Sequence, residues 1–180
     1  MSILIPKDEL TLTDMKDFRG KAINAGIARA VALKVAGAAD QLNVRAWENI
    51  LDAGAALDQW NTAALVAVGI RYSVFQAIPA PILAANKVAV FYKVGVETTP
   101  VPVSLLTFRI GGAVGNIKAE FDLEQLVNCL TQEGYFSQPV VYDPTNVMAV
   151  QVMARIATGV LARVQFGAII IEPAGQLVSG

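Results

Sequence analysis

The pattern of apolar and polar positions changes character near residue 62 and divides the chain into two parts. Before this point small, helix-compatible residues dominate, whereas after it β-branched residues alternate with small or polar ones between evenly spaced turn residues. We therefore expect a mainly β fold with an α-helical N-terminal region. The expected divisions are an extended arm over 1–12, a helical region over 13–61, a β-sandwich over 62–175 and a tail over 176–180.

Two helices are expected in the N-terminal region. The first spans residues 14 to about 36, with Thr13 as its N-cap and apolar residues at helical spacing, although 31–35 is also compatible with a strand. The second runs from a cap at Asn43 to near Trp60. Its apolar face follows a helical period: Trp47, Ile50, Leu51, Gly54 and Leu57.

About seven strands are expected after residue 62, joined mostly by brief turns. Their expected ranges are 64–78, 87–96, 103–110, 117–121, 140–142, 147–157 and 161–171, with one short helix over 123–131. In the first strand the alternation places Val66, Val68, Ile70, Tyr72 and Val74 on one face. In the second it places Val88, Val90, Tyr92, Val94 and Val96 on one face. This spacing predicts an antiparallel β-sandwich, jelly-roll-like, rather than a doubly wound α/β sheet.

The composition is unusually apolar, so the protein must bury a large apolar surface. The chain is 54% hydrophobic and 16% charged, with a mean hydropathy of +0.50. The apolar stretches 23–39 and 148–171 carry internal charges, so we expect no membrane span, and 14 basic against 15 acidic residues give no concentrated basic face for nucleic acid. We therefore expect burial between subunits of a homo-oligomer. The candidate interface residues are Ile3, Leu4, Ile5, Trp47 and Trp60.

Histidine is absent, which removes the commonest general base and most catalytic metal sites. We expect no catalytic, cofactor or metal site. The carboxylate pair Glu120 and Asp122, with Glu124 nearby, is the remaining candidate for acid–base chemistry, and an ordinary solvated strand end is the preferred interpretation. The lone Cys129 is expected to be a small core residue in a protein made in a reducing cytosol.

Two turns also suggest ligands. The glycine-rich segment 111–115 lacks the Lys-Ser/Thr of a P-loop, so we expect a hairpin loop rather than a phosphate site. In the turn 143–146 we expect the Asp143 side chain to bond its own backbone, with a calcium ion as the less favoured alternative.

Four segments carry a resemblance to a known class of protein: Lys87–Val94, the loop 111–116, Gln138–Val152 and Ala168–Gly175. Together they resemble virion proteins of tailed bacteriophages, especially capsid decoration (cement) proteins with β-sandwich or jelly-roll folds. The resemblance implies a homo-oligomer, often a trimer, that binds the major capsid protein or another virion protein. It also implies a location in the virion after synthesis in the host cytoplasm, with residues 2–12 as an arm that reaches a neighbour.

The helical region is longer than a minimal decoration protein requires, which leaves other virion roles open. A phage tail component or a receptor-binding, carbohydrate-binding module is the alternative. For that module we expect the binding loops at 79–86 and 135–146.

Overall fold

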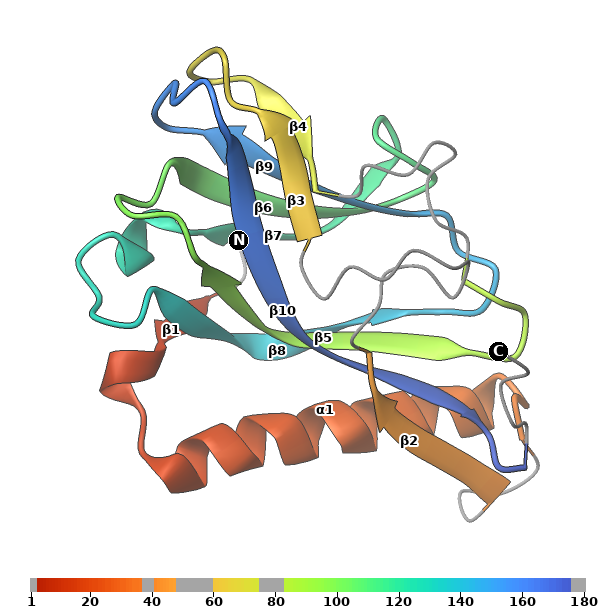
Figure 1. Cartoon of the computed structure of the whole chain (residues 1–180). Helices are drawn as coiled ribbons and strands as arrows, with labels where there is room; N and C mark the ends of the chain where they lie inside the picture. Colours follow the sequence, from red (N-terminus) through yellow and green to blue (C-terminus); the bar gives the residue numbers. More distant parts are fainter. Residues whose placement is uncertain (1–2, 37–40, 48–59, 75–82, 176–180) are drawn as a thin grey trace.

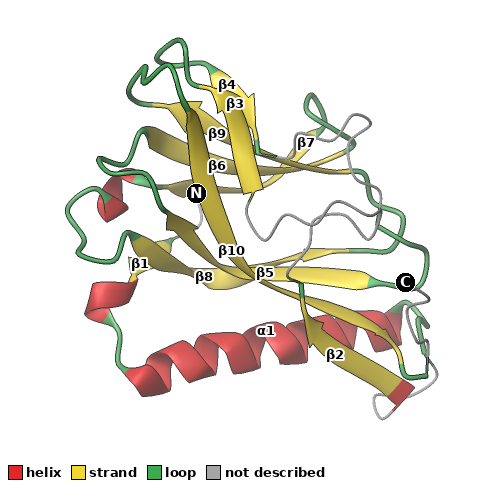
Figure 2. Ribbon diagram, in the orientation of Figure 1, coloured by secondary structure: helices red, strands yellow, loops and turns green. Residues whose placement is uncertain are grey.

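The computed structural model describes residues 3–36, 41–47, 60–74 and 83–175, and these form three layers (Figure 1). Helix α1 (Leu12–Ala32) covers one face of the larger sheet, and the smaller sheet covers the other (Figure 2). The larger sheet, sheet A, has the order β1 (Leu4–Pro6), β8 (Glu133–Tyr142), β5 (Val88–Val96), β10 (Leu161–Pro173) and β2 (Leu42–Ala46), and β3 (Trp60–Ala64) also pairs with β10. Sheet B has the order β4 (Arg71–Ser73), β9 (Met148–Ala154), β6 (Val103–Ile110) and β7 (Asn116–Asp122).

All of these strand pairs are antiparallel, and the two sheets pack as a sandwich. The expectation of a mainly β sandwich with an N-terminal helix is confirmed, whereas the jelly-roll topology stays a prediction. The main core lies between the sheets and is rich in aromatic rings: Trp47, Phe91, Phe108, Phe121, Phe136 and Tyr142. A second, smaller core lies between α1 and sheet A.

Helix α1 begins at Leu12, two residues earlier than the sequence pattern suggests. Its N-cap is Thr11 rather than Thr13, because Thr11 and Asp14 form a capping box. The Asp14 amide donates to Thr11 Oγ1 at 3.2 Å, and the Thr11 amide donates to Asp14 Oδ2 at 2.9 Å. The helix continues through Ala32, so the alternative of a strand over 31–35 is wrong. Within the described ranges no helix has both the length and the apolar character needed to cross a membrane.

The prediction of a second helix from Asn43 to near Trp60 is wrong, because both described ends of this segment are strands. Residues 42–46 form strand β2, which pairs with β10 from Ile169 to Pro173, and residues 60–64 form strand β3. Leu42 and Val44 pack against the small core while Asn43 and Arg45 alternate with them, which is the period of a strand. The middle of the predicted helix, residues 48–59, lies outside the described residues.

The predicted helix over 123–131 is also wrong, because only Glu124–Leu126 is helical and it is a 3₁₀ turn, η3. Leu123 and Leu126 are both fully buried, so the chain turns tightly enough to place both side chains in the core. The Glu124 amide donates to Asp122 Oδ1 at 2.8 Å, and this contact satisfies one of the amides at the start of the turn.

The N-terminal segment is part of the sandwich rather than a free arm. Strand β1 pairs with β8, and Leu4 is buried in the main core. The 3₁₀ helix η1 (Lys7–Glu9) follows, and Glu133 of β8 binds Lys7 at 2.9 Å and Lys93 of β5 at 3.1 Å. Burial alone would raise the pKa of Glu133, but the two lysines outweigh it and lower this pKa.

This ion pair network predicts a pH-dependent contribution to stability. Because the pKa of Glu133 is lower in the folded than in the unfolded protein, its contribution is present above the unfolded value of about 4.3 and is lost as the pH falls through the folded value. We expect Glu133→Gln to cost about 0.5–1 kcal/mol near neutral pH. Urea unfolding of both proteins across acidic pH should show the difference shrinking, and a difference that grows on acidification would contradict this assignment.

Close packing of α1 on sheet A depends on a stripe of small residues, Ala22, Gly26 and Ala30. A β-carbon at Gly26 would lie 2.5 Å from Ile171 Cδ1 and 2.8 Å from Val90 Cγ2, inside contact distance. At Gly20, in the same helix, a β-carbon would meet nothing within 4 Å. Packing against sheet A therefore requires a glycine at position 26 but not at position 20.

We expect the same substitution at these two positions to have opposite effects. Gly20→Ala should stabilise the protein by about 0.5–1 kcal/mol, because alanine lowers the entropy lost on helix formation. Gly26→Ala should destabilise it by about 1 kcal/mol, because overpacking outweighs the same gain. Denaturant unfolding of both variants measures this, and stabilisation by both would mean that the helix can move away from the sheet at no cost.

Strand β5 contains a β-bulge that the sequence pattern did not reveal. Its register shifts between Phe91 and Lys93 against both neighbouring strands. As a result Val88 and Val90 face α1, whereas Val94 and Val96 face sheet B together with Phe91. The prediction that alternate residues from Val88 to Val96 share one face is therefore wrong, because one extra residue moves the following side chains to the other face.

Candidate functional site

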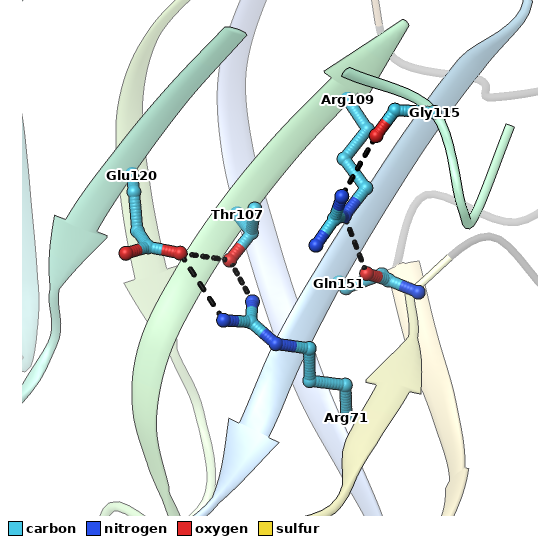
Figure 3. A network of polar contacts seen from close by, with 6 residues as sticks. All are labelled: Arg71, Thr107, Arg109, Gly115, Glu120 and Gln151. Carbon is cyan, nitrogen blue, oxygen red and sulfur yellow. Dashed lines mark hydrogen bonds and ion pairs between the residues drawn. The ribbon is translucent and has the colours of Figure 1, made fainter. Parts of the chain in front are cut away.

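A network of polar side chains covers the outer face of sheet B (Figure 3). Alternate residues of these strands fill the main core, so the intervening residues face away from it. The network takes side chains from all four strands: Arg71, Thr107, Arg109, Glu120 and Gln151. Thr107 is fully buried and Gln151 is 8% exposed, although both lie on the outer face.

Two arginines hold this network together. The Arg71 guanidinium donates to the Thr107 hydroxyl and, at 3.3 Å, to Glu120 Oε2, and the hydroxyl itself donates to the same carboxylate oxygen at 3.0 Å. Arg109 donates through Nε to Gln151 at 2.9 Å and through a terminal nitrogen to the Gly115 carbonyl at 2.7 Å. These contacts link neighbouring strands of sheet B laterally.

The two carboxylates of the candidate acid–base pair, Glu120 and Asp122, make separate structural contacts. Glu120 and Asp122 do lie on one face of β7, but each is engaged separately. Glu120 is held by Arg71 and Thr107, whereas Asp122 accepts the Glu124 amide. The geometry therefore gives both carboxylates structural contacts rather than a shared position for a reacting group.

The glycine-rich segment 111–115 is a hairpin loop between β6 and β7, as predicted. Gly111 and Gly112 have φ values of 91° and 89°, which only glycine adopts readily. A β-carbon at Gly115 would lie 1.9 Å from the Ile110 carbonyl oxygen. The turn itself thus explains these glycines.

The turn after β8 uses its acidic residue differently from the prediction. The Asp143 carboxylate accepts two hydrogen bonds from Arg29 of α1, at 2.7 and 2.6 Å, which lower the pKa of Asp143. The turn is closed instead by Asn146, whose Oδ1 accepts the Asp143 amide at 3.1 Å. Asp143 therefore joins the helix to the sheet, and the prediction that it bonds its own backbone is wrong.

The predicted strand 64–78 is interrupted, and the interruption places apolar side chains on the surface. After β3 the chain leaves the sheet because the Tyr72 hydroxyl accepts the amides of Val66 and Ala67, each at 3.0 Å. The chain re-enters a sheet at β4, and residues 75–78 lie outside the described residues. Val66, Val68 and Ile70 are consequently 70%, 63% and 51% exposed rather than buried.

A second loop, between β9 and β10, lies beside this one. The Leu65 amide donates to the Val160 carbonyl at 2.9 Å, and the Ala154 amide donates to the Ile70 carbonyl at 2.9 Å. Val160 and Leu161 are 57% and 41% exposed. The two loops form one end of the molecule, at the top of Figure 1. We call this end the apolar tip, and it consists of Val66, Val68, Ile70, Val160 and Leu161.

The five candidate interface residues do not share one surface. Leu4 is 2% exposed and Trp47 is 5% exposed, and Trp47 packs on Phe91 with ring centroids 5.4 Å apart. Both are therefore corrected to core residues of their own chain. Ile3 is 63% exposed and Ile5 is half-buried, so these two stay candidates, and the Trp60 side chain lies outside the described residues.

The segment expected to supply an aromatic binding loop is mostly strand β8. Tyr135, Phe136 and Tyr142 are all buried, and burial raises the pKa of Tyr142, whose hydroxyl donates to the Arg109 carbonyl at 3.0 Å. Of the other expected loop, residues 79–82 lie outside the described residues. The described aromatic side chains here thus pack the core rather than line an open loop.

The lone cysteine lies near the start of the chain in space. Cys129 is half-buried, and its thiol donates to the Gln125 carbonyl at 3.2 Å. Burial raises its pKa, and the negative charges of Asp8 and Glu9 add to the effect. A raised pKa lowers the thiolate fraction, which makes the thiol less reactive than a free cysteine.

No group of three or more metal-ligating side chains occurs in the part of the chain that the structure describes. Sequence comparison with protein-family models gives no match, and comparison with curated proteins gives none either. The sequence analysis missed the apolar tip because it placed Val66, Val68 and Ile70 inside a strand. One sequence signal could have found it, which is the glycine at position 69 inside the supposed strand. In the structure Gly69 adopts a φ of 77° and marks a turn.

Proposed function

We propose that this chain is a structural protein of a tailed-bacteriophage particle, a decoration protein that binds the capsid lattice as a homo-oligomer. The observation that carries the proposal is the apolar tip, where four exposed aliphatic side chains lie on two adjoining loops and a fifth, Leu161, begins strand β10. Contiguous apolar surface that is rimmed by polar groups marks a site of protein contact. The resemblance of the β segments to virion proteins supplies the kind of partner, which is the major capsid protein.

The rest of the molecule suits a passive mechanical role. The helix and the N-terminal segment are tied to strand β8 and the turn after it by ion pairs between distant elements, Arg29 with Asp143 and Lys7 with Glu133. On the outer face of sheet B, Arg71 binds Glu120, and Arg109 binds the neutral side chain of Gln151. A rigid body with a small adhesive surface can reinforce a lattice through many copies, because avidity multiplies weak contacts.

Particle composition tests this role. Virus particles purified by density gradient from cultures that carry the gene should contain peptides of this chain in a fixed ratio to the major capsid protein. Quantitative mass spectrometry of the particle and supernatant fractions measures that ratio. A ratio close to that of the capsid protein supports decoration, whereas a few copies per particle would indicate the alternative tail or receptor-binding role. Peptides found only in the supernatant would refute a virion role.

A further inference from the structure

Main-chain hydrogen bonds fix the two ends of the tip loop that follows β3. At its start Leu65 is fully buried, and its amide donates to the Val160 carbonyl at 2.9 Å. At its end the Gly69 amide donates to the Ala154 carbonyl at 2.8 Å. These bonds tie the loop to the β9–β10 loop and to the end of β9, so the residues between its two ends depend on other contacts.

A single side-chain oxygen holds the middle of this loop. The Tyr72 hydroxyl accepts hydrogen bonds from the amides of Val66 and Ala67, each at 3.0 Å. Within the described ranges no other side chain hydrogen-bonds to the backbone of residues 65–69. Two successive amides that converge on one oxygen restrict the backbone at both residues. The hydroxyl therefore fixes the direction in which the apolar side chains of this loop leave the backbone.

The tyrosine that supplies this oxygen is itself firmly placed. Tyr72 is the central residue of β4, where it pairs with Val152 of β9, and its side chain packs against the main core. Residues 65–70 belong to neither sheet, because β3 ends at Ala64 and β4 begins at Arg71. The position of the core is thus passed to the loop through the Tyr72 side chain.

We infer that Tyr72 is a positioning residue of the apolar tip, and that its hydroxyl holds Val66 and Val68 in the arrangement that binds the capsid protein. The inference rests on the proposed function, since it concerns the same surface and the same partner. A loop that is already ordered loses less conformational entropy on binding, so the affinity rises without any new contact. Tyr72 acts through the loop, because the loop's own amides occupy its oxygen.

Removing this one oxygen tests the inference. Tyr72→Phe keeps the ring that packs against the core and leaves the amides of Val66 and Ala67 without their acceptor. We expect amide hydrogen exchange, followed by NMR, to become faster at these two residues but not at Gly69, whose acceptor is a main-chain carbonyl. Purified protein is then titrated onto particles produced without the gene, and sedimentation measures the bound fraction. We expect the apparent Kd of the variant to rise about 10-fold.

Tyr142→Phe is the matched control, because it removes the same atom from a tyrosine that supports the core. The Tyr142 hydroxyl donates to the Arg109 carbonyl at 3.0 Å and lies 3.5 Å from the Ala149 carbonyl, near the start of β9. The tip is bonded to the opposite end of this strand, at Ala154. We expect Tyr142→Phe to lower the denaturant midpoint at least as much as Tyr72→Phe, because the oxygen is more deeply buried, yet to keep the wild-type Kd. An equal rise in Kd for both variants would overturn the inference, since reduced stability alone would then explain it.

A double-mutant cycle shows whether the hydroxyl acts through the tip. Changing both Val66 and Val68 to alanine shortens two exposed side chains of the tip and should weaken particle binding by itself. If the hydroxyl works by positioning these side chains, Tyr72→Phe should raise the Kd less in this alanine background than in the wild type. The same fold-change in both backgrounds would contradict the positioning role.

Failure of the inference and failure of the proposed function give different results. A wild-type protein that does not bind particles would refute the virion role, and the inference with it. A wild-type protein that binds, together with a Tyr72→Phe protein of the same Kd, would refute the positioning role and leave the virion role standing.

Discussion

Replacing Phe108 with alanine is expected to lower the free energy of unfolding by about 3–5 kcal/mol, because it opens a cavity at the centre of the main core. Phe108 is fully buried in β6. Its ring centroid lies 5.2 Å from that of Phe91 and 5.6 Å from that of Phe136. Edge-on and tilted contacts of this kind stabilise beyond the burial of area alone, and they join strands of both sheets. Denaturant unfolding measures this loss as a lower midpoint concentration, with no change in the slope of unfolding free energy against denaturant concentration.

A matched control for this prediction lies at the end of the same strand. Val114, in the loop that follows β6, is 96% exposed, so Val114→Ala should change the stability by less than about 0.5 kcal/mol. Similar losses at both positions would mean that the interface between the sheets is not the main source of stability. Domains of this size have only about 5–15 kcal/mol to lose, so the Phe108 variant should be close to unfolding near physiological temperature.

The sequence pattern predicted the class of fold because the strands of the sandwich carry strong local signals. Strand β6 spans Val103–Ile110, as expected from its β-branched and aromatic residues, and the β6–β7 loop follows from its glycines. Burial on both faces of sheet A also explains why β5 and β10 contain almost continuous apolar runs. Where local preference and tertiary packing agree, the pattern is sufficient.

The errors arose where long-range contacts decided the outcome. Residues 42–46 join the edge of sheet A because β10 offers unpaired backbone groups from Ile169 to Pro173, a fact that no local window contains. The bulge near Tyr92 changes the facing of Val94 and Val96 through a single extra residue. Likewise, the apolar tip depends on a contact between Tyr72 and the amides of Val66 and Ala67, which removes three aliphatic side chains from the supposed strand.

The N-terminal segment shows why a plausible functional interpretation can fail on packing. Its apolar residues and Pro6 were expected to form an arm for a neighbouring subunit, but Leu4 fills the core of its own chain. A β-carbon at Gly134 would lie 2.8 Å from Leu4 Cγ, so the opposing strand is shaped to accept this side chain. Deleting residues 1–12 would also remove the Thr11 cap of α1. Such a deletion would therefore report on folding before it reported on assembly.

The second large effect is expected at Glu172, the most buried charged side chain among the described residues. It is 2% exposed at the end of β10, where it binds Arg45 Nε at 2.8 Å and Lys87 Nζ at 3.4 Å. Glu172→Gln keeps the size of the side chain but leaves two cations facing a neutral amide. We expect a loss of about 3 kcal/mol, because a carboxylate removed from a buried ion pair costs far more than one removed from the surface.

Glu133→Gln is the matched control, since Glu133 also bridges two cations, Lys7 and Lys93, but its side chain is 22% exposed compared with 3% for Glu172. Water screens the exposed network, so its loss should be only about 0.5–1 kcal/mol. Denaturant unfolding of both variants near neutral pH gives the comparison directly. A stability loss at Glu172 several times larger than that at Glu133 would show that burial, rather than the number of ion pairs, determines how strongly each carboxylate stabilises sheet A. Equal losses would show that Arg45 and Lys87 reach solvent easily once the carboxylate is gone.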